Sequence, residues 1–199
     1  MPAIENLLTK ADAILIGGAM AYTFLKARGE DVGTSRVEDD RLDDARRILD
    51  QAKNGTCVLH LPGDHVIAQR FEGDARSRTV AAAIPDGWMG LDIGPDTRSA
   101  YVNVIREAMT IVWNGPMGVF EWPKFCAGTR EIAQALVHAT EATGAISIVG
   151  GGDSAAAADK FDLASRFSHV STGGGASLQM LEGKSFPSVE LLDDDDDDA

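Results

Sequence analysis

Apolar residues follow two alternating patterns along this sequence, short continuous runs and stripes with helical spacing. The runs predict buried strands at 13–16, 56–61, 66–68, 110–113, 146–149 and 168–170. The stripes predict helices at 1–10, 19–28, 38–54, 96–108, 129–140 and 176–182, and another that follows Asp153-Ser154 and runs to about 161. Strand–helix alternation is typical of an α/β fold, here a three-layer, Rossmann-like parallel sheet with helices on both faces.

Two segments have neither pattern and are expected to be loops. Residues 71–79 are polar and turn-like, and residues 87–95 are apolar but interrupted by glycines too often for a helix.

One strand ends in an unusual glycine run. Ile146–Val149 leads into Gly150, Gly151 and Gly152, which Asp153 and Ser154 follow. Both of these polar residues are typical helix caps, and bare glycines let a ligand approach the backbone. The start of a helix with free N–H groups favours phosphate. The simpler alternative is a tight turn without a ligand, and the run matches neither G-x-G-x-x-G nor the P-loop motif.

Similar glycine-rich loops follow four of the predicted strands, at Gly17, Asn114, Gly150 and Gly173. In a parallel sheet such loops share one edge, which is where ligands bind. Four of them together predict a nucleotide-sized ligand along that edge.

A few polar side chains could take part in chemistry. Asp153 is interpreted equally as a helix cap or as a Mg²⁺ ligand beside a phosphate, and the two roles are compatible. Glu121 is either a surface residue or an acceptor for ribose hydroxyls. His138 is expected to be exposed and His169 to be a satisfied core histidine. Because no Ser-His-Asp or Cys-His arrangement is visible, covalent catalysis has no support.

The formal net charge of −13 argues against nucleic acid or an anionic membrane as partner, although six of the negative charges lie in Asp193–Asp198. A polyanionic ligand would need backbone dipoles, a few cations or a metal ion. Cys57 and Cys126 form no C-x-x-C and suggest reduced cysteines. With no membrane-length apolar run or signal peptide, the sequence predicts a soluble, cytoplasmic protein.

Five motifs occur in a recognisable order. They are Ile16–Phe24, Gly87–Asp92, Trp113–Glu121, Gly150–Ser154 and Ser171–Ser177. Together they closely resemble the carboxyl-terminal, nucleotide-binding half of phosphoglycerate kinase, over about Ile4 to Leu192. The resemblance implies one nucleotide-binding domain at 1–192, and 193–199 is expected to be an acidic disordered tail.

The resemblance also implies a reaction, ATP and 3-phosphoglycerate giving ADP and 1,3-bisphosphoglycerate in glycolysis, with Mg²⁺ and ATP/ADP bound on this half. Gly18, Gly90, Leu91 and Val119 match the adenine pocket of the family. The residues that match its ribose and neighbouring phosphate site are Asn114, Pro116 and Glu121. Its phosphate and metal loop is matched by Gly150, Gly151, Gly152, Asp153 and Ser154, with Asp153 as metal ligand. Gly173 and Gly174 match the loop whose backbone N–H groups face the transferred phosphoryl group. Together with Gly151 and Gly152, they are the predicted catalytic residues.

The sequence also departs from the family. It has no counterpart of the basic amino-terminal half that holds the sugar acid, nor of two lysines that contact the nucleotide phosphates. We therefore expect Mg-nucleotide binding with little or no turnover by this chain alone. The alternative is a stand-alone nucleotide-binding module, or a split-kinase subunit that needs a separate amino-terminal half. A dinucleotide oxidoreductase is disfavoured because G-x-G-x-x-G is absent.

Overall fold

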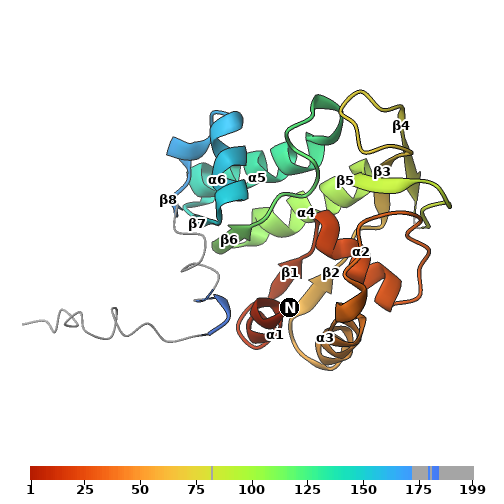
Figure 1. Ribbon diagram of the computed structural model, residues 1–199. Coiled ribbons are helices and arrows are strands. Elements are labelled where there is room, and N and C mark those ends of the chain that lie inside the picture. The colour runs from red at the N-terminus through yellow and green to blue at the C-terminus, as the bar shows by residue number, and fades with distance from the viewer. Residues whose placement is uncertain (82, 172–178, 180, 184–199) are drawn as a thin grey trace, which may run out of the picture.

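A computed structural model describes residues 1–81, 83–171, 179 and 181–183 (Figure 1). The helices are α1 (Pro2–Leu7), α2 (Gly18–Ala27), α3 (Leu42–Asn54), α4 (Pro95–Glu107), α5 (Ala127–Thr143) and α6 (Gly152–Lys160). Short 3-10 turns are η1 (Asp39–Arg41), η2 (Pro123–Phe125) and η3 (Ala164–Arg166). The strands are β1 (Ala13–Leu15), β2 (Val58–His60), β3 (Asp64–Ala68), β4 (Ser77–Ala81), β5 (Met89–Ile93), β6 (Thr110–Asn114), β7 (Ile146–Gly150) and β8 (His169–Val170).

Two of the sheets are parallel. One contains β1 and β2, and the other has the order β6-β7-β8. Helices lie between the consecutive strands of both sheets (Figure 1). The predicted α/β fold with parallel strands is therefore confirmed for these five strands.

The third sheet is antiparallel, with the order β4-β3-β5, so the prediction of a parallel sheet throughout is wrong here. The expected loop at 71–79 contains part of the outer strand β4, and the expected loop at 87–95 contains all of the outer strand β5. β4 is polar because it is an exposed edge strand, which gives it no apolar run to recognise. In β5, Gly90 interrupts the apolar run because Tyr22 packs closely against it.

Local chemistry explains where α4 begins. Pro95 occupies its first turn, where a missing N–H costs nothing. The buried Asp64 carboxylate then accepts hydrogen bonds from the N–H groups of Asp96, at 3.0 Å, and Thr97, at 2.8 Å. The start of α4 is thereby fixed to the first residue of β3.

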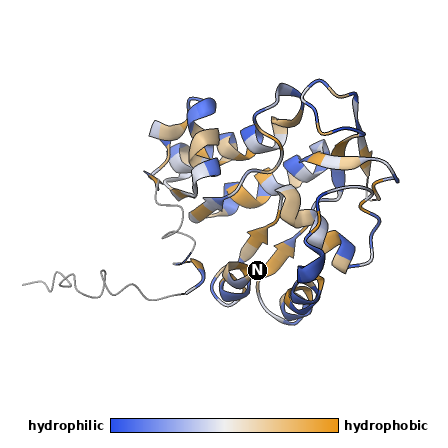
Figure 2. Cartoon of the chain, in the orientation of Figure 1, coloured by the Kyte–Doolittle hydropathy of each residue, from blue (hydrophilic) through white to orange (hydrophobic). Residues whose placement is uncertain are grey.

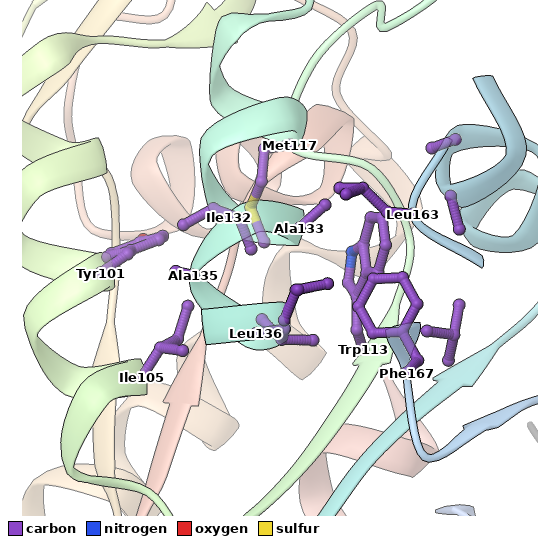
Figure 3. Packing of buried hydrophobic residues seen from close by; sticks show 14 of the residues in the cluster. Tyr101, Ile105, Trp113, Met117, Ile132, Ala133, Ala135, Leu136, Leu163 and Phe167 are labelled. Carbon is purple, nitrogen blue, oxygen red and sulfur yellow. The ribbon is translucent and has the colours of Figure 1, made fainter. Parts of the chain in front are cut away.

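The largest hydrophobic cluster lies between the helices α4 and α5 and the β6-β7-β8 sheet (Figure 3). Its bulky members include Tyr101, Ile105, Trp113, Ile132 and Leu136. A second cluster joins α1, α2 and α3 to the β1-β2 sheet. Figure 2 shows β1 and β2 as hydrophobic, whereas α1 and α3 beside them carry many hydrophilic residues.

The carboxyl-terminal predictions fall largely outside the described residues. The helix expected at 176–182 does so for most of its length, and the acidic tail at 193–199 does so completely. Among the residues described, Leu181 accepts a hydrogen bond from the Asn6 side chain at 2.7 Å. No helix in the described part of the chain combines the length and apolarity needed to cross a bilayer.

Candidate nucleotide site

The loop after β1 (residues 16–17, leading into α2) and the loop after β6 (residues 115–122) touch each other. The Gly18 N–H donates to the Met117 carbonyl oxygen at 3.1 Å. Gly18 has a φ of +60°, and a Cβ there would lie only 2.7 Å from the Pro116 carbonyl oxygen. Both facts require glycine at this position, so the contact brings two of the predicted site residues, Gly18 and Pro116, together.

The antiparallel sheet supplies another side of the same site. The Val119 N–H donates to the Leu91 carbonyl oxygen at 2.9 Å, which joins the loop after β6 to β5. A side chain at Gly90 would collide with the Tyr22 hydroxyl on α2, the helix that begins at Gly18. The four residues predicted for adenine therefore lie on mutually contacting segments.

The glycine run after β7 borders the loop after β6. Gly150 pairs with Asn114 across the two strands. Gly151 has a φ of +87°, and a Cβ there would lie 3.0 Å from the Asn114 side-chain oxygen. α6 begins at Gly152, so the N–H groups of its first turn have no acceptor inside the helix. This arrangement of backbone donors suits a phosphate.

The prediction that Asp153 and Ser154 cap α6 is wrong. The capping position is Gly151, and no side-chain oxygen accepts a hydrogen bond there. Instead, the buried Ser154 hydroxyl accepts a hydrogen bond from the Gly115 N–H at 2.7 Å. Ser154 therefore holds α6 against the loop after β6, while Asp153 lies exposed in the first turn.

The surroundings of Asp153 fit a Mg²⁺ ion that would be coordinated by this one carboxylate and otherwise by bound phosphate and water. The described residues contain no group of three or more side chains that could bind a metal. Mg²⁺ in proteins commonly takes only one or two carboxylates and completes its shell with substrate phosphates and water. A single exposed carboxylate beside phosphate-ready N–H groups fits that pattern.

Other predicted residues have different outcomes. Glu121 is exposed, and its carbonyl oxygen accepts a hydrogen bond from the Lys160 ammonium at 2.7 Å. Gly173 and Gly174 lie outside the described residues. His138 is exposed, as predicted, whereas His169 is also exposed and the prediction of a core histidine is wrong.

Asp92 helps to hold segments of the candidate site together, and the sequence did not single it out. Its buried carboxylate accepts hydrogen bonds from Gly128 N–H at 2.8 Å and Ile93 N–H at 2.9 Å. Burial raises the pKa of Asp92 to about 7, because desolvation outweighs these two hydrogen bonds. A carboxylate inside an otherwise apolar run was the available signal.

Thr129 was also missed. Its buried hydroxyl accepts hydrogen bonds from the N–H groups of Met117, at 3.1 Å, and Gly118, at 3.3 Å. Thr129 thus fixes the loop after β6 to the start of α5, and Asp92 fixes β5 to the same helix start. No sequence signal distinguished this threonine from the others.

Comparison with known proteins identifies the family of this chain. The phosphoglycerate kinase family model matches residues 1–184. Phosphoglycerate kinase from Thermosipho africanus is 56% identical over 191 residues, which cover 95% of this chain and 47% of that protein. The cytosolic enzyme from Nicotiana tabacum is 53% identical over 192 residues, covering 96% of this chain and 48% of the relative.

Solved structures give the same result. Phosphoglycerate kinase from Coxiella burnetii aligns with a TM-score of 0.90 at 43% identity, over 95% of this chain and 48% of the other. The chain thus spans about half the length of the relatives it matches. On this evidence, it belongs to the phosphoglycerate kinase family.

Proposed function

We propose that this chain is the nucleotide-binding half of a phosphoglycerate kinase. It binds Mg-ADP or Mg-ATP where the loops after β1, β6 and β7 meet. The reaction is phosphoryl transfer between ATP and 3-phosphoglycerate, giving ADP and 1,3-bisphosphoglycerate. The other half of such an enzyme would hold the sugar acid.

One observation carries the proposal. The predicted site residues that the structure describes, taken from four separate segments, form one contiguous set. Gly18 touches the loop after β6, and that loop touches both Leu91 and Ser154. Because ligands of α/β folds bind at the edge where the loops after the strands meet, this contiguity supports a single ligand site there.

The residues have distinct roles in this proposal. Gly18, Gly90, Leu91 and Val119 form the adenine side, and Asn114, Pro116 and Glu121 flank the ribose. The first-turn N–H groups of α6 hold phosphate oxygens, and Asp153 holds Mg²⁺, which neutralises phosphate charge when bound. Phosphoryl transfer depends mainly on positioning and charge stabilisation, so the chain alone should turn over little or nothing.

Calorimetric titration with Mg-ADP tests the proposal. We expect saturable binding by the full chain, at least tenfold weaker binding by Asp153→Ala, and no binding of NAD. Asp159→Ala is a matched control, because Asp159 is exposed near the other end of the same helix. No binding by a folded chain, or equal weakening in both variants, would contradict the proposal.

A split kinase is a second candidate, and the coverage of the relatives favours it. Because the chain spans only about half their length, a complementary half could restore turnover. Activity that appears only when both polypeptides are mixed would support a split subunit, whereas nucleotide binding without activity in the mixture would favour a stand-alone module. A cytoplasmic location remains a prediction.

A further inference from the structure

A loop of the antiparallel sheet packs directly against the segment that carries Glu121. The loop consists of residues 69–76, which connect β3 to β4, and we call it the hairpin loop. The segment it contacts is residues 119–125, the end of the loop after β6 together with η2. This segment contains two of the proposed nucleotide contacts, Val119 and Glu121, whereas the hairpin loop contains none.

Trp122 is the centre of this contact. Phe71 of the hairpin loop packs on its indole ring, with 4.7 Å between the ring centroids and an interplanar angle of 56°. A Cβ at Gly73, in the same loop, would lie only 3.0 Å from the indole, so the ring rests against bare backbone. Phe125 of η2 meets Trp122 edge-on, at 6.2 Å between centroids. Trp122 is therefore held by the hairpin loop and by η2 at once.

A lysine adds polar bonds to the same contact. The Lys124 ammonium donates to the carbonyl oxygens of Asp74, at 2.5 Å, and of Ala75, at 3.1 Å. Both acceptors belong to the hairpin loop. Because hydrogen bonds from a charged donor are stronger than neutral ones, they help to keep the hairpin loop in place against Trp122.

The contact extends into a hydrophobic cluster that includes the proposed adenine side. Its buried members include Ala75, Leu91 and Phe125. Val119 and Trp122 are partly buried and pack against it. The hairpin loop and the segment 119–125 therefore share a core, and a change in one of them reaches the other through packed side chains.

Glu121 lies between fixed points of the backbone. The Trp122 N–H donates to the Val119 carbonyl oxygen at 3.1 Å, which closes a four-residue turn with Glu121 in its third position. The Glu121 carbonyl oxygen accepts a hydrogen bond from the Lys160 ammonium of α6 at 2.7 Å. Glu121 itself is exposed. The direction of its carboxylate is therefore set by the turn, and Trp122 holds one end of that turn.

We propose that Phe71 and Trp122 are positioning residues for Glu121, through which the hairpin loop sets the preference of the nucleotide site for ribose hydroxyls. This inference rests on the proposed function, in which Glu121 flanks the ribose. A hydrogen bond weakens steeply when its distance or angle departs from the optimum. Release of the turn around Glu121 therefore weakens its bonds to the ribose, and Phe71 acts on the ribose only through Trp122.

Titration of the full chain with Mg-ADP and with Mg-2′,3′-dideoxy-ADP by calorimetry tests the proposal. The ratio of the two dissociation constants reports the ribose hydroxyls alone, because the base, the phosphates and the metal are the same. We expect the wild type to bind Mg-ADP at least tenfold more tightly. Glu121→Ala should bring the ratio close to one. Phe71→Ala should reduce it at least threefold and change the affinity for the dideoxy ligand less than twofold.

Met109→Ala is the matched control for Phe71→Ala. Both side chains are 62% exposed, but Met109 lies just before β6, at the opposite end of that strand from the proposed site. It should leave both dissociation constants unchanged. Trp122→Phe should keep the wild-type ratio, because Phe71 still has a ring to pack on, whereas Trp122→Ala should reduce it. If circular dichroism shows that Trp122→Ala is unfolded, the exposed Phe71 still provides the test.

Several results would overturn the proposal. One is a wild-type ratio in Phe71→Ala or in Glu121→Ala. Another is an equal loss of affinity for both ligands in Phe71→Ala, which is what a purely structural role would produce. The double variant Phe71→Ala/Glu121→Ala should have the same ratio as Glu121→Ala, and a different ratio would contradict action through Glu121. Absence of Mg-ADP binding would overturn the proposed function as well, whereas the other results leave it intact.

Discussion

The hydroxyl oxygen of Ser154 lies 2.7 Å from the backbone nitrogen of Gly115, although 39 residues separate them in sequence. Ser154 is fully buried, so the Gly115 N–H has little access to water as an alternative partner. This hydrogen bond fixes the start of α6 to the loop after β6, and it therefore sets the spacing between the phosphate side and the ribose side of the proposed site.

Replacing Ser154 with alanine should destabilise the chain. The substitution leaves the part-buried Gly115 N–H group without this acceptor, and loss of an acceptor for a buried donor typically costs about 1–3 kcal/mol. Urea unfolding would measure the loss. Ser99→Ala is the control, because the Ser99 hydroxyl bonds to a carbonyl on an exposed helix turn. Similar losses in both variants would argue against a special role for Ser154.

Gly90→Ala should also destabilise the fold, by about 1–3 kcal/mol for overpacking. The added methyl group would collide with the Tyr22 hydroxyl, and Tyr22 is buried and cannot move aside freely. Combining the substitution with Tyr22→Phe should recover part of the loss in a double-mutant cycle. Gly63→Ala, where a methyl group would meet nothing within 4 Å, should change stability little.

The glycine pattern identified turns that the structure brings together at the candidate site. Gly18 and Gly151 have positive φ, and a Cβ would lie close to the Pro116 carbonyl oxygen at Gly18 and to the Asn114 side chain at Gly151. Their identity therefore records a local steric requirement that sequence can reveal. The parallel strands were likewise marked by continuous apolar runs, because they are covered by helices.

The antiparallel sheet was not predictable in the same way. β4 is an edge strand with mostly exposed residues, so its pairing with β3 leaves no hydrophobic signature. The role of Ser154 was misjudged for a related reason. A serine at the start of a helix satisfies the capping pattern, but its partner, Gly115, is determined by how β6 and β7 align in three dimensions.

Asp92 should make stability fall as pH rises. Its pKa is raised from 3.8 to about 7 in the folded chain, so between these values the folded state keeps a proton that the unfolded state releases. Unfolding then becomes easier by about 1.4 kcal/mol per pH unit for this one group, and the effect is complete above pH 7. Urea unfolding at pH 5, 6, 7 and 8 would measure it.

Asp92→Asn isolates this contribution, since asparagine resembles the protonated carboxyl group and does not titrate. The stability of the variant relative to the wild type should increase from pH 5 to pH 7 and then level off. Asp86→Asn, on an exposed loop, serves as the control and should show no such trend. A constant difference between Asp92→Asn and the wild type would contradict the assignment.

His65 should have the opposite pH dependence. Its ring is fully buried beside Tyr22, at 5.5 Å between ring centroids, and neither nitrogen has a hydrogen-bond partner among the described residues. Burial lowers the pKa of His65 below 6.5, so acidification protonates the unfolded state first and stability falls below about pH 6.5. His65→Leu should remove that fall and gain about 1–2 kcal/mol at pH 7, because it replaces unpaired polar atoms with carbon. Urea unfolding at pH 5 and 7 measures both effects, and His138→Leu on the exposed face of α5 is the control. If His65→Leu is less stable than the wild type at both pH values, the ring nitrogens of His65 have hydrogen-bond partners in solution and the prediction is wrong.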